Sequence, residues 1–164
     1  MIVRPTLLIL PLAASLAAPA SAQRSASAPG DARVVGTWSL VLEKSRFSPG
    51  PTPTSQIRSY EAQNGGYRAT IKTTFADRPS TYIDYVANYD SLEYPVMGSA
   101  DYDTIRLKKV DEFTSEAILG HAGRVIATTR RVIAPDGQTM TITFKADDIK
   151  GKPVNNVMVF ARQK

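Results

Sequence analysis

The sequence predicts an all-β fold: an antiparallel up-and-down meander β-barrel of about 8–10 strands. Three observations support this class. Apolar and polar residues alternate with a period of two along most of the chain after residue 33. Turn signals rich in Gly, Pro, Asn and Asp recur about every 8–12 residues. No segment shows a helical period, and the short connections favour pairing between strands that follow one another in sequence.

Residues 1–22 have the pattern of a signal peptide. Arg4 is the only charge ahead of an apolar stretch at residues 7–18, and an Ala-Ser-Ala triplet at residues 20–22 precedes Gln23. The stretch is shorter than the about 20 apolar residues that a membrane-spanning helix needs. We therefore expect cleavage before Gln23, a periplasmic or secreted protein, and no integral membrane segment after cleavage.

After the signal peptide, residues 23–33 predict a disordered leader, and residues 34–164 predict a single domain. The chain has no Cys, which excludes disulfides and thiolate chemistry and leaves stability to packing and sheet closure. Its net charge of +5 is scattered along the chain rather than clustered. This favours an ordinary solvated surface over attraction to anionic lipid, lipopolysaccharide or acidic glycans. Export by itself argues against nucleic acid as a partner.

The first strand is predicted around Trp38, with Leu40 and Leu42 on the same face. The Ser-Pro-Gly-Pro-Thr-Pro run at residues 48–53 then predicts a stiff, extended connector, because proline fixes φ and removes a donor. The remaining strands are expected at residues 56–62, 67–75, 81–89, 93–97, 104–110, 113–119, 124–133, around 140–144 and at 154–162. The intervening turns contain Asn64-Gly65-Gly66, Asp77-Arg78-Pro79, Gly120-His121-Ala122-Gly123 and Pro135-Asp136-Gly137, and residues 147–153 form a loop. Alternation assigns the lumen to Ile71, Phe75, Ile105, Leu107, Met140, Ile142 and Phe144.

Residues 35–40, Val-Gly-Thr-Trp-Ser-Leu, resemble the opening strand of the lipocalin and fatty-acid-binding-protein superfamily. Residues 38–51, 89–90 with 94–96, 131–140 and 151–159 resemble small exported bacterial proteins of lipocalin-like type. The resemblance implies a lipocalin-like barrel in which Gly36 and Trp38 form a structural plug at one end. It also implies an Arg from a late strand, Arg162 or Arg131, stacked over the Trp ring.

Two features depart from the superfamily. The Pro-rich connector occupies the place where fatty-acid-binding proteins have two lid helices. The last strand carries Met158-Val159-Phe160 where many of those proteins have an Arg-x-Tyr carboxylate clamp, so a clamp of that kind is not supported.

Five of the seven tyrosines lie between residues 82 and 102, among acidic residues. They predict a ligand-binding rim that includes Tyr82, Tyr85 and Tyr94, with Phe144 on a later strand. The alternative is that they are ordinary strand tyrosines beside acidic turns. Arg130 and Arg131 are also candidates, because adjacent strand residues face opposite sides and one of them must point inward. An inward Arg needs either a carboxylate, such as Asp84 or Glu116, or an anionic ligand.

We predict no cofactor, metal site or catalytic residue. His121, the only histidine, lies in a Gly-flanked turn, and no Gly-x-Ser-x-Gly elbow or Gly-rich phosphate loop is present. The expected function is binding of a small apolar or amphiphilic molecule in the lumen. One alternative is an envelope interaction or structural protein with a fully packed barrel. Another is a cyclase or isomerase that uses carboxylates in the barrel mouth; this would need a carboxylate with a raised pKa in a pocket.

Overall fold

The computed structural model describes residues 32–148 and 150–164. The predicted signal peptide and most of the predicted leader lie outside these residues. The described chain forms ten strands and one 3-10 turn, η1 (Leu42–Lys44). The strands are β1 (Gly36–Leu40), β2 (Ser55–Gln63), β3 (Gly66–Thr74), β4 (Thr81–Asn88), β5 (Tyr94–Met97), β6 (Thr104–Lys109), β7 (Thr114–His121), β8 (Arg124–Ile133), β9 (Thr139–Asp147) and β10 (Pro153–Arg162).

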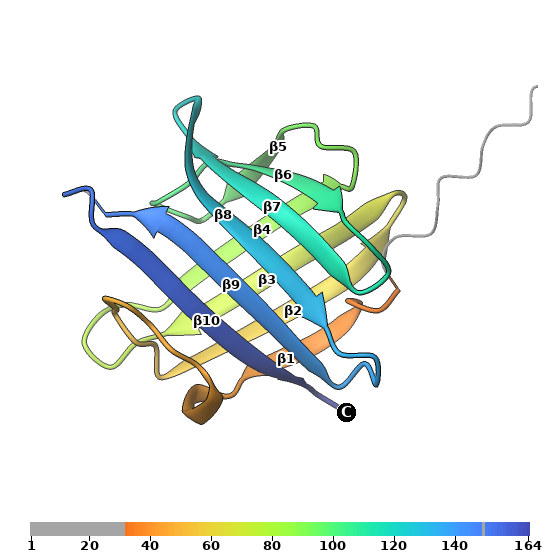
Figure 1. The fold of residues 1–164 in the computed structure, drawn as a ribbon, viewed down its shortest axis with the longest axis horizontal. Helices are drawn as coiled ribbons and strands as arrows, with labels where there is room; N and C mark the ends of the chain where they lie inside the picture. Colours follow the sequence, from red (N-terminus) through yellow and green to blue (C-terminus); the bar gives the residue numbers. More distant parts are fainter. Residues whose placement is uncertain (1–31, 149) are drawn as a thin grey trace, which may run out of the picture.

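The strands pair antiparallel in chain order, and β1 also pairs with β10, so the sheet closes into a barrel (Figure 1). The all-β class and the up-and-down meander predicted from the sequence are confirmed. Closure leaves no free sheet edge, which suits a chain without disulfides. Among the described residues, no helix is long and apolar enough to span a membrane.

The prediction for Leu42 is wrong. β1 ends at Leu40, and Leu42 begins η1 with 38% of its surface exposed. The turn is closed by Ser45, whose amide donates to the Leu42 carbonyl at 3.0 Å and whose hydroxyl donates to the Val41 carbonyl at 2.8 Å. The chain turns away from the sheet here, so Leu42 does not lie with Trp38 on the inward face of β1.

One end of the barrel is closed by Trp38, which is fully buried. Its indole Nε1 donates to the Val34 carbonyl at 2.8 Å, so the segment before β1 folds over this end. The guanidinium of Arg162 lies 4.2 Å from the Trp38 ring centroid and donates at 2.6 Å to the carbonyls of Val35 and Gly137. A cation over an indole face is a favourable arrangement.

Gly36 is required for this closure. Its φ of +123° lies in a region that L side chains rarely adopt, and a Cβ at this position would lie 2.7 Å from Nη1 of Arg162. Glycine therefore allows both the backbone turn into β1 and the close approach of the guanidinium.

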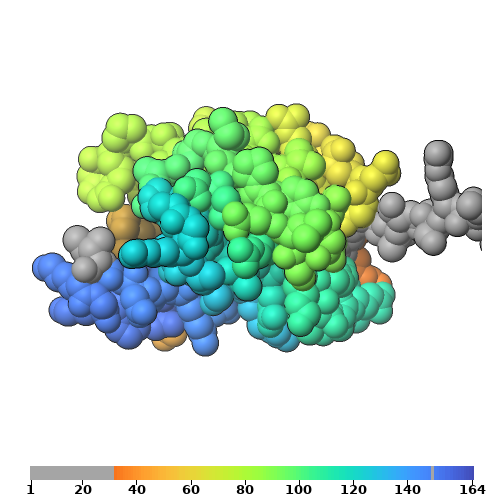
Figure 2. Space-filling view, turned by 90° about the horizontal axis from the view of Figure 1, so that it is seen from above, coloured from red at the N-terminus to blue at the C-terminus, as the bar shows by residue number. Residues whose placement is uncertain are grey.

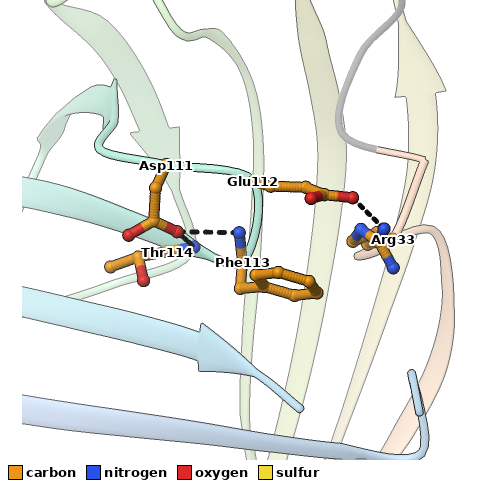
Figure 3. A network of polar contacts seen from close by, with 5 residues as sticks. All are labelled: Arg33, Asp111, Glu112, Phe113 and Thr114. Carbon is orange, nitrogen blue, oxygen red and sulfur yellow. Dashed lines mark hydrogen bonds and ion pairs between the residues drawn. The ribbon is translucent and has the colours of Figure 1, made fainter. Parts of the chain in front are cut away.

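A second set of contacts holds the segment before β1 against the loop between β6 and β7 (Figure 3). Arg33 pairs with Glu112, and its guanidinium lies 4.6 Å from the ring centroid of Phe113. Asp111 shapes that loop by accepting from the amides of Phe113 and Thr114, both at 2.8 Å. Arg33, which the sequence assigned to the leader, thus belongs to the folded domain.

The opposite end of the barrel is formed by loops. The connector between β1 and β2 lies there beside the β3–β4 loop and the β9–β10 hairpin (Figure 1). In Figure 2 the yellow-green β3–β4 loop and the blue β9–β10 hairpin occupy the same end of the molecule, with part of the connector between them. The connector is tied to β10, since the Asn155 amide donates to the Ser48 carbonyl at 2.9 Å.

Candidate functional site

The barrel encloses a cavity of about 490 Å³ that extends to the looped end. At that end it is bordered by connector residues Pro51 and Pro53 and by Phe75 and Arg78 of the β3–β4 loop. Pro51 and Arg78 are exposed, so the cavity reaches the surface here. Its volume is within the range of about 300–1,000 Å³ that is typical of small-molecule sites.

Much of the cavity wall is apolar. The inward positions of β3, β4, β6, β7, β9 and β10 supply Ile71, Ile83, Ile105, Leu107, Leu119, Ile142, Phe144 and Met158. Six of the seven lumen residues predicted from the sequence therefore border the cavity: Ile71, Phe75, Ile105, Leu107, Ile142 and Phe144. Met140 does not, because it is fully buried in the core on the far side of Ile142 along β9.

The β2 wall is polar and centres on Arg58. Arg58 Nε donates to Gln56 Oε1 at 2.8 Å, and its Nη1 lies 3.4 Å from the Tyr60 hydroxyl. Gln56 in turn donates to the Thr73 hydroxyl of β3 at 2.7 Å. Residues 56, 58 and 60 alternate along β2, so all three side chains reach the cavity. The amide and the phenol hold the guanidinium in place without adding a carboxylate.

Arg131 of β8 faces the same cavity and is only 6% exposed. Its guanidinium lies 5.3 Å from the ring centroid of Tyr60 and 5.0 Å from that of Tyr67, and it donates to the Tyr89 hydroxyl. Tyr67 meets the Tyr60 ring edge-to-face at 5.1 Å. Aromatic faces and hydroxyls thus hold this buried cation at the inner part of the cavity.

The two guanidiniums change the acidity of the phenols around them. Burial opposes ionisation of Tyr60, but the charges of Arg58 and Arg131 outweigh it and lower the pKa of Tyr60. Burial raises the pKa of Tyr67 and raises that of Tyr85 well above its usual value. Tyr60 is therefore distinguished from its neighbours by its position between two positive charges.

The structure decides between Arg130 and Arg131. Arg130 lies on the outer face and pairs with Glu116 at 2.6 Å, whereas Arg131 points inward. Asp84 also lies outside, where it pairs with Arg68 at 2.7 Å. The idea that Asp84 or Glu116 compensates the inner Arg is wrong, because both carboxylates belong to outward positions and bind arginines of that face.

The predicted tyrosine rim is not assembled. Tyr85 is buried and borders the cavity with Phe144. Tyr82 is three positions from Tyr85 on the same strand, so it faces outward and is 56% exposed. Tyr94 is half-buried, donates to Asp90 at 2.6 Å, and is not among the residues that line the cavity. Of the three named rim tyrosines, only Tyr85 reaches the lumen.

The plug residues lie together at the closed end, apart from the cavity. Arg162, rather than Arg131, stacks over Trp38. Gly36, Trp38 and Arg162 do not border the cavity. Their contacts maintain closure, whereas the arginines that face the cavity, Arg58 and Arg131, are different residues on other strands.

Arg58 is one of the polar cavity residues that the sequence did not predict; Gln56 and Thr73 are two others. The signal was present as Arg58-Ser59-Tyr60, an Arg-x-Tyr pattern whose two side chains must share a face in a strand. The pattern lies on β2, whereas many fatty-acid-binding proteins carry an Arg-x-Tyr pair on the last strand. Gln56 and Thr73, both buried, were missed for the same reason: a polar residue at an inward position looks like an outward one when the strand is read alone.

Other chemistry finds little support in residues 32–148 and 150–164. No group of three or more His, Cys, Asp or Glu side chains gathers there to bind a metal. His121 lies 3.6 Å from Asp103 at the surface, where both side chains are about half exposed. No Asp or Glu in this part of the chain is buried. Two acidic residues, Asp101 and Glu116, border the cavity; Asp101 is exposed, and Glu116 pairs with Arg130.

Comparison with known proteins adds no family to this description. A scan against protein-family models matches none, and a search of curated proteins finds no matching relative. The geometry alone supports a closed ten-strand antiparallel barrel, consistent with a calycin-like fold, that contains a cavity with two inward arginines.

Proposed function

We propose that this protein binds a small anionic amphiphile inside its barrel, with the acidic head group against Arg58 and Arg131 and the apolar part along the apolar side chains of β3, β4, β6, β7, β9 and β10. The observation that carries this proposal is the placement of two guanidiniums in one buried cavity. Both guanidiniums contact neutral groups, the phenols of Tyr60 and Tyr89 and the amide of Gln56. An acidic head group would add a negative charge beside two positive charges in a low-dielectric cavity, where such an attraction is strong.

The shape of the cavity supports the orientation. Arg131 lies beside Tyr60 and Tyr67 at the inner part, whereas Phe75 and the connector border the opening. A ligand would enter through the looped end with its charge leading and its apolar part last. A fully packed barrel, the alternative for an interaction or structural protein, is less compatible with an interior space of about 490 Å³.

The proposal includes export and a lipocalin-like relationship. The signal-peptide pattern before Gln23 supports a periplasmic or secreted site of action. The Gly-x-Trp opening, with Arg162 stacked on Trp38, supports kinship with lipocalins and fatty-acid-binding proteins. In this chain the Arg-x-Tyr pair would come from β2 instead of the last strand.

The test is calorimetric titration of the purified protein with decanoate and with decanol. We expect decanoate to bind with a micromolar Kd, about −8 kcal/mol, and decanol to bind more weakly. Arg131→Gln should weaken decanoate binding about tenfold or more, since a hydrogen bond to a charged group contributes about 1.5–3 kcal/mol. Arg130→Gln on the outer face is the matched control and should leave the Kd unchanged.

Circular dichroism would establish that both variants are folded. Native mass spectrometry of protein purified from its own envelope would identify any ligand that co-purifies. Equal effects of Arg130→Gln and Arg131→Gln, or no binding of decanoate or of any acidic amphiphile, would refute the proposal.

A further inference from the structure

Gln56 lies between two other polar side chains on the cavity wall. It faces Thr73 directly across the β2–β3 pair, and Arg58 is the next inward residue along β2. Gln56 is 9% exposed and Thr73 is 6% exposed. The distances are 2.7 Å from Gln56 Nε2 to the Thr73 hydroxyl and 2.8 Å from Gln56 Oε1 to Arg58 Nε. The register of β2 and β3 thus anchors the amide at one end, and the amide holds the guanidinium at the other.

The chemistry of Arg58 sets the orientation of this amide. A guanidinium N–H can only donate, so Gln56 must present its carbonyl oxygen to Arg58 Nε. The amide nitrogen then faces Thr73, whose hydroxyl accepts. The guanidinium also lies 3.4 Å from the Tyr60 hydroxyl and 5.2 Å from the ring centroid of Phe160. The bond to Gln56 is the shorter of the two hydrogen bonds, so the amide is the main support for the orientation of Arg58.

We propose that Gln56 determines head-group selectivity in the lumen, because its neutral amide positions Arg58 without adding a negative charge beside it. A glutamate at this position would accept the same bond, but its charge would pair with the guanidinium and repel an acidic head group. Gln56 is a positioning residue, since it acts on the ligand through Arg58. This inference rests on the proposed function and adds a residue that sets its specificity.

The experiment measures the preference for decanoate over decanol by calorimetric titration at neutral pH, where decanoate is ionised. In Gln56→Glu the new carboxylate accepts from Arg58, and the Thr73 hydroxyl can rotate to donate to it, so both bonds are kept. The added charge should lower the affinity for decanoate about tenfold or more and that for decanol at most about threefold. The preference for the anion should therefore fall.

Gln56→Met tests positioning without a change of charge. Methionine has a similar length, but its thioether is only a weak acceptor for Arg58 Nε. The preference for decanoate should fall about threefold, less than in Gln56→Glu, because Arg58 keeps its charge and loses its support. Gln63→Glu is the matched control: it adds the same charge at an exposed position of β2 that does not line the cavity, and it should leave the preference unchanged. Circular dichroism establishes that each variant is folded.

An unchanged preference in either folded Gln56 variant would overturn this inference. So would an equal loss of decanoate and decanol affinity, because a merely structural role changes both together. An effect of Gln63→Glu as large as that of Gln56→Glu would assign the change to net charge and would also overturn it. These outcomes leave the proposed function intact if Arg131→Gln still weakens decanoate binding. If the unmodified protein binds neither ligand, both are refuted.

Discussion

Arg162 connects β10 to three other parts of the closed end, which makes its removal a strong test of the fold. Its guanidinium donates to the Val35 and Gly137 carbonyls, each at 2.6 Å, and also to the Arg33 carbonyl. The same group lies 4.2 Å above the Trp38 ring. Arg162→Met keeps the apolar stem but removes all of these contacts.

The magnitude follows from those contacts. A hydrogen bond from a charged donor contributes about 1.5–3 kcal/mol when buried. The Arg162 bonds are partly buried, so we take about 1 kcal/mol for each of the three. The cation–π contact adds about 0.5–1 kcal/mol. Arg162→Met should therefore lower the free energy of unfolding by about 3–4 kcal/mol.

Urea denaturation followed by circular dichroism measures this loss. Arg130→Met is the control, because an exposed ion pair such as that with Glu116 contributes less than about 1 kcal/mol. A double-mutant cycle with Trp38→Leu should give a coupling energy of about 1 kcal/mol between the two side chains. A loss below about 1 kcal/mol for Arg162→Met, or no difference from Arg130→Met, would show that this end is not held as described.

Three further predictions concern the backbone, the phenols and export. Gly36→Ala should cost about 1–3 kcal/mol in thermal or chemical unfolding, because φ is +123° and the new Cβ would lie 2.7 Å from Arg162; a neutral effect would contradict this. Burial raises the pKa values of Tyr67, Tyr85 and Tyr102, so the folded state retains protons that the unfolded state releases above about pH 10, and stability should fall as pH rises through that range. The lowered pKa of Tyr60 offsets part of this loss of stability. Tyr85→Phe should make stability fall less steeply with pH in the alkaline range. If that substitution leaves the pH dependence unchanged, other groups are responsible for it. N-terminal sequencing of exported material should begin at Gln23, and a retained Met1 in a membrane fraction would exclude cleavage.

The arginine at the closed end and the arginines in the cavity have different structural roles. Arg162 donates hydrogen bonds to backbone carbonyls and stacks on the Trp38 ring, whereas Arg58 and Arg131 border the cavity. The proposed function assigns Arg58 and Arg131 to ligand binding, whereas Arg162 contributes to closure of the barrel.

The sequence alone determined the fold class and nearly all strand positions. Period-two alternation and turn residues are local signals, so they located β3 and β8 to within about a residue or two. Short connections were sufficient to predict the meander, because consecutive strands have little chain with which to reach a distant partner. The sequence also established that Arg130 and Arg131 face opposite sides, since that follows from strand geometry.

Only the tertiary structure decided which face of each strand lies inside the barrel and which side chains come together there. Arg58 and Arg131 are more than seventy positions apart and approach one another only because ten strands close around a common axis. Glu116 and Asp84 compensate outer arginines because register aligns Glu116 with Arg130 and Asp84 beside Arg68. Whether space remains inside depends on the summed volumes of inward side chains from every strand, a property of the closed barrel that no single segment carries.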